Sequence, residues 1–189
     1  MNSRGVRHFG IAFSTTMIEA ILDGLKTETR RLASDTSPLS KALPGDILWV
    51  KEGFEVLEWM AADRRARIRY LTRCPCDGVI VQWPDRLVMG KLGAKLPRFM
   101  PREASRINLT LAERLREPLL AVDDAGAVAE GISLADQLPH EILADGSWRT
   151  GARRERYLSL WDKINAQRGY GCDAEPEVDV LRFGQYSSS

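Results

Sequence analysis

The first strongly patterned segment of the chain runs from Ser14 to Leu25, where apolar residues recur at helical spacing. The residues that would share one buried face are Ile18, Ile21, Leu22 and Leu25. Thr16 and Glu19 have the spacing of a capping box, in which each side chain binds a backbone N–H at the start of a helix. Gly24 is expected to end the helix, because glycine enters the left-handed conformation without steric cost. The pattern therefore predicts a short helix with a sharp stop.

Apolar or alternating runs elsewhere in the chain indicate short strands. These runs lie at residues 8–13, 47–50, 107–111 and 178–183, and residues 67–71 and 78–83 suggest a hairpin. Helices are expected at residues 125–130, 134–138 and 155–167, the first two after acidic or hydroxyl capping residues. The chain is therefore expected to combine several short strands with a few short helices.

The composition is that of one globular domain. The chain has 189 residues, of which 44% are hydrophobic and 28% charged. Its apolar runs are all shorter than the ~20 residues that a membrane-spanning helix needs. Arg4 and Arg7 near the start are not followed by a long apolar segment, so no leader is expected and the predicted location is cytoplasmic.

Charge and cysteines limit the classes of partner. A formal net charge of +1 argues against attraction of the whole chain to nucleic acid, but residues 86–106 hold six basic residues and one acidic residue. That span is read either as a basic face or as a flexible loop. Three cysteines, at 74, 76 and 172, are too few for a disulfide framework. Zinc binding with His8 or His140 as a fourth ligand is disfavoured because Cys-x-Cys is not the usual zinc spacing, so no metal is expected.

The segment from Lys26 to Arg31 carries the most reactive side chains. In an extended conformation Thr27, Thr29 and Arg31 share one side of the chain, and the residues between them share the other. One interpretation is that Lys26, Thr29 and Arg31 converge on a pocket. A partly desolvated lysine beside arginines loses its proton more readily and can act as a base toward a hydroxyl. The other interpretation is a solvated basic turn after a surface helix.

The run Gly24-Leu25-Lys26-Thr27-Glu28-Thr29-Arg30-Arg31 resembles the signature of the ASCH domain, a PUA-like family whose pattern is Gly-x-Lys-x-x-Glu-x-Arg. Gly24, Lys26 and Arg31 match, and Thr29 stands at the glutamate position. The branch of the family that acts as an N4-acetylcytidine amidohydrolase carries threonine there. Further segments resemble the larger, phage-associated members: residues 11–15, 44–52, 100–102 and 159–165.

The resemblance implies a fold and a domain organisation. It implies an α+β fold built as a PUA-like mixed β-barrel with flanking helices. The chain would form a single domain over residues 1–189 with an ordered core at about 8–183. Insertions at the barrel edge are expected at about 54–100 and 139–154.

The resemblance also implies an activity. By analogy with the amidohydrolase branch, Lys26 would be the base and Thr29 the nucleophile in removing an N4-acyl group from a cytidine-type nucleoside, without a cofactor. Glu130 is the implied acidic member, because the run from Glu130 to Leu134 fits the setting of that residue in the family. From the residues alone, Glu130 is equally well an exposed glutamate at a helix end. The implied partners are a modified nucleoside or RNA.

Five further residues are assigned to substrate binding: Arg30, Arg31, Trp49, Arg102 and Arg106. Arginine forks suit phosphate or carboxylate, and a tryptophan ring can stack on a base, although Trp49 in an aliphatic run fits a core position better. Two alternative functions stay open. One is a PUA-like RNA-binding module without catalysis. The other is a ribonuclease, which ranks lower because His8 and His140 do not form a suitable acid–base pair.

Overall fold

The computed structural model describes residues 5–74, 77–132, 144–145, 151–184 and 187–188. Its contacts divide the chain into two compact units. Unit 1 comprises Met1–Glu19, Asp46–Thr110 and Tyr186–Ser189, and unit 2 comprises Ala20–Gly45 and Leu111–Gln185. Helix α1 (Thr15–Leu22) and strand β8 (Ile107–Pro118) each begin in unit 1 and end in unit 2. The single domain over 1–189 stays a prediction.

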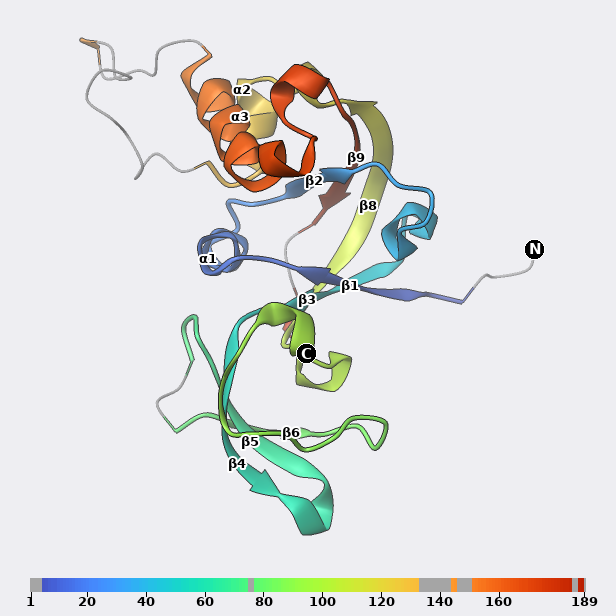
Figure 1. The fold of residues 1–189 in the computed structure, drawn as a ribbon, viewed down its shortest axis with the longest axis vertical. Helices are drawn as coiled ribbons and strands as arrows, with labels where there is room; N and C mark the ends of the chain where they lie inside the picture. Colours follow the sequence, from blue (N-terminus) through green and yellow to red (C-terminus); the bar gives the residue numbers. More distant parts are fainter. Residues whose placement is uncertain (1–4, 75–76, 133–143, 146–150, 185–186, 189) are drawn as a thin grey trace. The chain divides into compact units, whose positions relative to one another are not determined.

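Unit 1 holds strands of two sheets (Figure 1). In the first, β1 (His8–Ala12) runs parallel to β3 (Ile47–Lys51), and β3 pairs antiparallel with the first part of β8. Strand β10 (Ser187–Ser188) also pairs with β8, beyond the predicted end of the core at residue 183. The second sheet has the antiparallel order β6-β5-β4-β7, with β4 at Phe54–Met60, β5 at Arg65–Tyr70, β6 at Val79–Gln82 and β7 at Gly93–Lys95. The expected hairpin near 67–83 is its β5–β6 pair.

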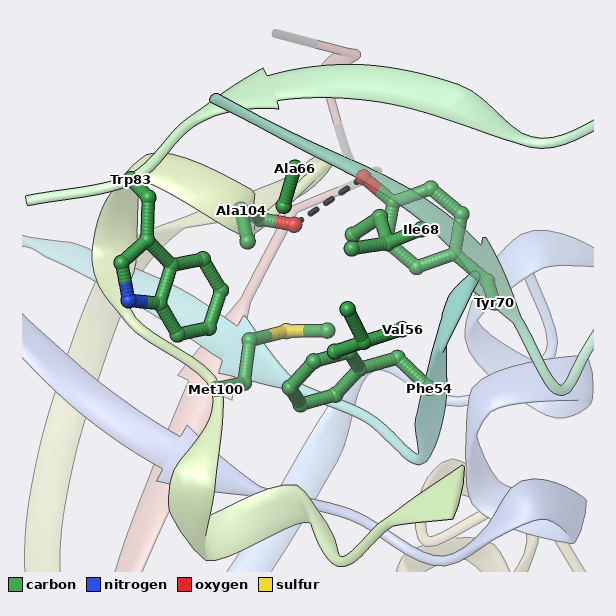
Figure 2. Packing of buried hydrophobic residues seen from close by; sticks show 8 residues of the cluster. All are labelled: Phe54, Val56, Ala66, Ile68, Tyr70, Trp83, Met100 and Ala104. Carbon is green, nitrogen blue, oxygen red and sulfur yellow. Dashed lines mark hydrogen bonds between the residues drawn. The ribbon is translucent and has the colours of Figure 1, made fainter. Parts of the chain in front are cut away.

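One hydrophobic cluster of unit 1 lies on one face of this second sheet (Figure 2). Alternation along β4 and β5 turns Phe54, Val56, Ala66, Ile68 and Tyr70 to that face. The cluster is completed by buried residues that follow β6 in the sequence: Trp83, Met100 and Ala104. The Tyr70 hydroxyl donates to the backbone oxygen of Ala104 at 3.0 Å, so this buried hydroxyl is satisfied.

Unit 2 combines a three-strand sheet with two helices. Strand β9 (Glu177–Phe183) lies between β2 (Glu28–Leu32) and the second part of β8, antiparallel to both. Helices α2 (Asp124–Ala129) and α3 (Ala152–Asn165) lie beside each other (Figure 1). Apolar side chains of these helices, of β9 and of the segment 119–122 form one core: Leu119, Val122, Ala127, Tyr157, Trp161, Val178 and Val180.

Short 3₁₀ helices connect these elements. They lie at Pro38–Lys41, Ala61–Asp63, Pro97–Phe99, Arg102–Ala104, Leu119–Ala121, Ala166–Arg168 and Cys172–Ala174. The predicted helix at 134–138 lies outside the described residues. Helix α3 begins at Ala152, three residues before the predicted start.

The mixed α+β class is confirmed by these helices and sheets. The strand order β1-β3-β8-β9-β2 does not return on itself among the described strands, so the predicted closed barrel is not seen in their pairing. No helix in the described ranges is both long enough and apolar enough to cross a membrane.

The predicted details of α1 need two corrections. The helix begins at Thr15, and Ser14 rather than Thr16 stands at its N-cap, with the Ser14 Oγ accepting from the Met17 N–H at 3.5 Å. Leu25 was placed on the buried face, but it follows the helix stop and is 51% exposed. The stop itself is confirmed, because Gly24 has a φ of 72°.

Candidate active site

The turn after α1 determines where Lys26 points. The N–H groups of Leu25 and Lys26 both donate to the backbone oxygen of Ala20, which closes the end of the helix. The Thr27 N–H then donates to the backbone oxygen of Ala129 at 2.9 Å. This bond ties the turn to the last residue of α2, so the side chain of Lys26 is delivered to the carboxyl end of that helix.

Helix α2 brings Glu130 to the same place. Asp123 caps the helix, since its Oδ1 accepts from the Gly126 N–H at 2.7 Å, and Glu130 occupies the C-cap. Gly131 follows with a φ of 92°, and a Cβ there would lie 3.0 Å from the Cβ of Ala20 and 3.3 Å from that of Lys26. Positive φ and close packing both favour glycine at this position. The backbone can therefore pass close to Lys26 while Glu130 turns inward.

Lys26 and Glu130 form a buried ion pair across 104 residues of sequence. The Lys26 Nζ donates to Glu130 Oε2 at 2.6 Å and to the backbone oxygen of Glu130 at 2.8 Å. The two side chains are only 0% and 3% exposed. Burial lowers the pKa of Lys26, a positive charge on Arg31 lowers it further, and the Glu130 carboxylate opposes both. The ammonium also satisfies a carbonyl at the end of α2, where a cation is favoured.

The second carboxylate oxygen of Glu130 is held by other donors. The backbone N–H of Arg30 donates to Oε1 at 2.5 Å, and the Tyr157 hydroxyl donates to the same oxygen at 3.2 Å. Burial and the nearby carboxylate raise the pKa of Tyr157, so its hydroxyl stays protonated and acts as a donor. Strand β2 and helix α3 thus fix Glu130 from two sides.

Thr29 and Arg31 lie on one side of β2, as the alternation predicts. Arg31 Nη1 donates to Thr29 Oγ1 at 2.8 Å and to the backbone oxygen of Arg30 at 3.0 Å. Thr29 is 0% exposed, whereas Arg31 is half-buried. Burial lowers the pKa of Arg31, and the Glu130 carboxylate opposes that effect, which places Arg31 within electrostatic range of the ion pair. The structure therefore joins Lys26 directly to Glu130 and Arg31 directly to Thr29, and the two pairs are linked by the electrostatic influence of Arg31 on Lys26 and of Glu130 on Arg31.

Arg30 is occupied by protein carboxylates. Its guanidinium forms ion pairs with Glu28, with Glu117 at 3.1 Å and with Glu130 at 3.7 Å. Burial opposes the positive charge of Arg30, but Glu28 and Glu130 outweigh that effect and raise its pKa. Glu28 is in turn bound by Arg182 at 2.7 Å. Arg30 is therefore part of a buried ion-pair network within unit 2. Its role in substrate binding stays a prediction.

The other three predicted binding residues belong to unit 1. Trp49 on β3 is half-buried, with Lys51 Nζ 4.8 Å from the centre of its ring. Arg106 forms a two-pronged pair with Glu52, with both N–O distances at 2.9 Å. Burial raises the pKa of Glu52, and Arg106 opposes that shift. Arg102 lines a surface hollow with Glu103, Ser105 and Asn108. The cluster around Lys26 is built from unit 2 alone.

Sequence reasoning missed Tyr157 as a member of the site. It lies in the segment predicted as a helix at residues 155–167, and in α3 it is buried together with Trp161. The available signal was chemical, because a buried tyrosine usually needs a hydrogen-bond partner. No group of three or more His, Cys, Asp or Glu placed to hold a metal occurs in the described part of the chain. Cys76 and His140 lie outside it.

Comparisons with known proteins add little to this geometry. No model of a known protein family matches the sequence, and no curated protein matches it. Among solved structures, an ASCH domain from Lactobacillus crispatus JV V101 is similar, with a TM-score of 0.46 and 10% sequence identity. The match covers 96% of this chain and 81% of that chain. A similarity at this level assigns neither a family nor a function to the chain.

Proposed function

We propose that this chain is an ASCH-type, metal-independent amidohydrolase that removes an N4-acyl group from cytidine-type nucleosides. The observation that carries the proposal is the buried hydrogen bond of 2.6 Å between Lys26 Nζ and Glu130 Oε2. Lys26 stands three positions before Thr29 in the sequence. The order Gly24, Lys26, Thr29, Arg31 resembles the signature of that branch of the family. Groups with perturbed proton affinity gathered in this way are typical of reactive sites.

The first step is proton transfer and attack. Lys26 in its neutral form takes the proton of the Thr29 hydroxyl, and the Thr29 oxygen forms a bond to the carbonyl carbon of the acyl group. The carbonyl π electrons move to its oxygen, which becomes an oxyanion. Arg31, which donates to the Thr29 Oγ1 at 2.8 Å, lies beside the attacking oxygen and stabilises the oxyanion.

Collapse of the oxyanion breaks the bond between the acyl carbon and N4. The proton held by Lys26 passes to the leaving nitrogen, and the Lys26–Glu130 hydrogen bond keeps the ammonium in place while it does so. The products are cytidine and an acyl ester on Thr29. Lys26 then takes a proton from water, and the hydroxide attacks the ester carbonyl. The bond from the acyl carbon to the Thr29 oxygen breaks, the acyl group leaves as a carboxylic acid, and Lys26 returns the proton to the Thr29 oxygen.

The reaction requires access to a buried hydroxyl. Thr29 is fully buried, and the half-buried Arg31 holds its oxygen. Movement of the Arg31 guanidinium from Oγ1 to the acyl oxygen of a substrate exposes the nucleophile and supplies the charge that the oxyanion needs. The Arg31 side chain would thus shield the Thr29 hydroxyl before the substrate binds and stabilise the oxyanion afterwards.

The test is the release of cytidine from N4-acetylcytidine. The wild type should convert it, and Lys26→Met and Thr29→Val should each lose at least about a hundredfold in kcat, the contribution typical of a positioned base. Thr27→Val makes the same substitution two residues away and should keep the wild-type rate. Absence of turnover by the wild type, or equal rates in Thr29→Val and Thr27→Val, contradicts the proposal.

An RNA-binding module without catalysis is the second candidate. It is favoured by the complete burial of the Lys26 and Thr29 side chains and by the bond from Lys26 to the backbone oxygen of Glu130, since both suit a structural cap on α2. Its test is an RNA titration at two salt concentrations, because phosphate contacts give affinity that falls as salt rises. Weak binding that does not depend on salt contradicts this candidate.

A further inference from the structure

Glu130 uses its two oxygens for different purposes. Oε2 accepts from Lys26 Nζ at 2.6 Å, whereas Oε1 accepts from the Arg30 N–H at 2.5 Å and from the Tyr157 hydroxyl at 3.2 Å. Donors to Oε1 draw negative charge away from Oε2, because hydrogen bonds to a carboxylate stabilise its ionised form. The donors on one oxygen therefore control how strongly the other attracts the lysine ammonium.

The two donors to Oε1 differ in kind. The Arg30 N–H belongs to β2, where Arg30 is paired with Val180 of β9, so the backbone fixes its position. The Tyr157 hydroxyl comes from α3, 27 residues beyond Glu130 in the sequence, and a single substitution can remove it. Tyr157 is 5% exposed, and its ring lies 5.8 Å from the Arg30 guanidinium. A buried hydroxyl aimed at one carboxylate oxygen is a specific contact that core packing alone does not require.

We propose that Tyr157 is a positioning residue that acts through Glu130 and sets how firmly Lys26 keeps its proton. This inference rests on the proposed function, in which Lys26 must be neutral to accept the proton of Thr29. Tyr157 hydrogen-bonds to Glu130, and its effect on the reaction is carried by the Lys26–Glu130 contact.

The charged groups around the pair determine the direction of the effect. Lys26 is influenced by Glu130, Glu28 and Arg31. Glu130 is contacted by Lys26, by Tyr157 and by the Arg30 amide, its Oε1 lies 3.7 Å from the Arg30 guanidinium, and Arg31 is within electrostatic range. Tyr157→Phe removes one donor and leaves every charge in place. The carboxylate then carries more negative charge toward Lys26, so the ammonium holds its proton to a higher pH.

The kinetic test compares Tyr157→Phe with Tyr170→Phe, which removes a hydroxyl from an exposed tyrosine of unit 2. Rates on N4-acetylcytidine are measured between about pH 6 and about pH 10, a range that brackets a lowered lysine pKa. In Tyr157→Phe the rise of kcat with pH should shift to higher pH by about one pH unit. At pH values below that rise, kcat should therefore fall about tenfold. KM should stay unchanged, and Tyr170→Phe should match the wild type. A loss that is equal at every pH indicates a structural role and overturns the inference.

A second measurement does not depend on activity. The chain has six lysines, so the side-chain Cε resonance of Lys26 can be assigned by its absence in Lys26→Met and titrated in each protein. Its midpoint should lie higher in Tyr157→Phe than in the wild type, and equal midpoints overturn the inference. If the wild type lacks turnover, the proposed function fails while the titration still decides the coupling. Should Tyr157→Phe fold poorly, 3-fluorotyrosine at position 157, a stronger donor, should move the midpoint down, and an unmoved midpoint overturns the inference.

Discussion

Replacing Lys26 with methionine tests whether the ion pair with Glu130 holds unit 2 together. Methionine keeps most of the length and apolar volume of the lysine stem but removes the ammonium. Glu130 then stays buried with a negative charge and without the donor that lies 2.6 Å from its Oε2. The Glu130 backbone oxygen at the end of α2 also loses its bond to Lys26.

The size of the loss follows from these distances. At an effective dielectric constant of about 20, unit charges 2.6 Å apart attract each other by about 6 kcal/mol. Part of that attraction is offset by the cost of taking both charges out of water, and breaking one member of a buried pair usually destabilises a protein by about 3–5 kcal/mol. Glu130 keeps the Arg30 N–H, the Tyr157 hydroxyl and the Arg30 guanidinium at 3.7 Å. We therefore expect the free energy of unfolding to fall by about 3 kcal/mol, the lower end of that range.

The assay is urea unfolding at neutral pH, followed by circular dichroism and by hydrogen exchange of the β2 and α2 amides. Lys163→Met, at an exposed position of α3, is the matched control and should change stability by less than about 0.5 kcal/mol. The double variant Lys26→Met/Glu130→Met removes both charges and should recover to within about 1.5 kcal/mol of the wild type. A Lys26→Met protein as stable as the Lys163→Met control refutes the reasoning, as does a double variant that is less stable than the single one.

Three further predictions concern pH, the helix stop and the core of unit 1. Because burial lowers the pKa of Lys26 below its ordinary value of 10.5, the folded chain releases that proton at lower pH than the unfolded chain. The stability difference between wild type and Lys26→Met should therefore rise with pH up to about pH 10.5, by at most about 1.4 kcal/mol per pH unit, and a flat or falling difference in urea titrations counts against it. Gly24→Ala, at a φ of 72°, should cost about 1 kcal/mol by the same assay, and no cost means that the stop does not need glycine. Phe54→Ala should cost about 3–5 kcal/mol and change the fluorescence of Trp83, whose ring centre lies 6.4 Å from that of Phe54; an unchanged spectrum with full stability contradicts the packing in Figure 2.

Local signals in the sequence predicted the features that depend on neighbouring residues. The end of α1 was predictable because it depends on one residue: Gly24 adopts a positive φ, which glycine does without steric cost. The alternation in β2 placed Thr29 and Arg31 on one side, and their hydrogen bond agrees with it. The start of α1 was misplaced because Ser14 and Thr16 are both good caps and the sequence does not rank them.

Features that depend on distant residues could not be read from the pattern. The resemblance suggested Glu130, but its contact with Lys26 spans 104 residues, and no local spacing specifies such a pair. Tyr157 has the periodicity of a core residue, and its contact with Glu130 depends on how α3 packs against α2. Arg30 and Arg106 were predicted to bind substrate because an arginine fork suits phosphate or carboxylate, and in the fold Arg30 pairs with Glu28 and Arg106 with Glu52. Charged side chains that pair inside a fold look the same in sequence as charged side chains that meet a ligand.

The central claim is that the Lys26–Glu130 pair activates the Thr29 hydroxyl, and trapping the acyl group tests it most directly. The protein is mixed with N4-acetylcytidine, quenched in acid within the first turnover, digested and examined by mass spectrometry. The account predicts an acetyl group on Thr29 in the wild type, and its absence in Lys26→Met. Cytidine release without acetylation of Thr29, or acetylation of Thr29 that persists unchanged in Lys26→Met, would contradict it.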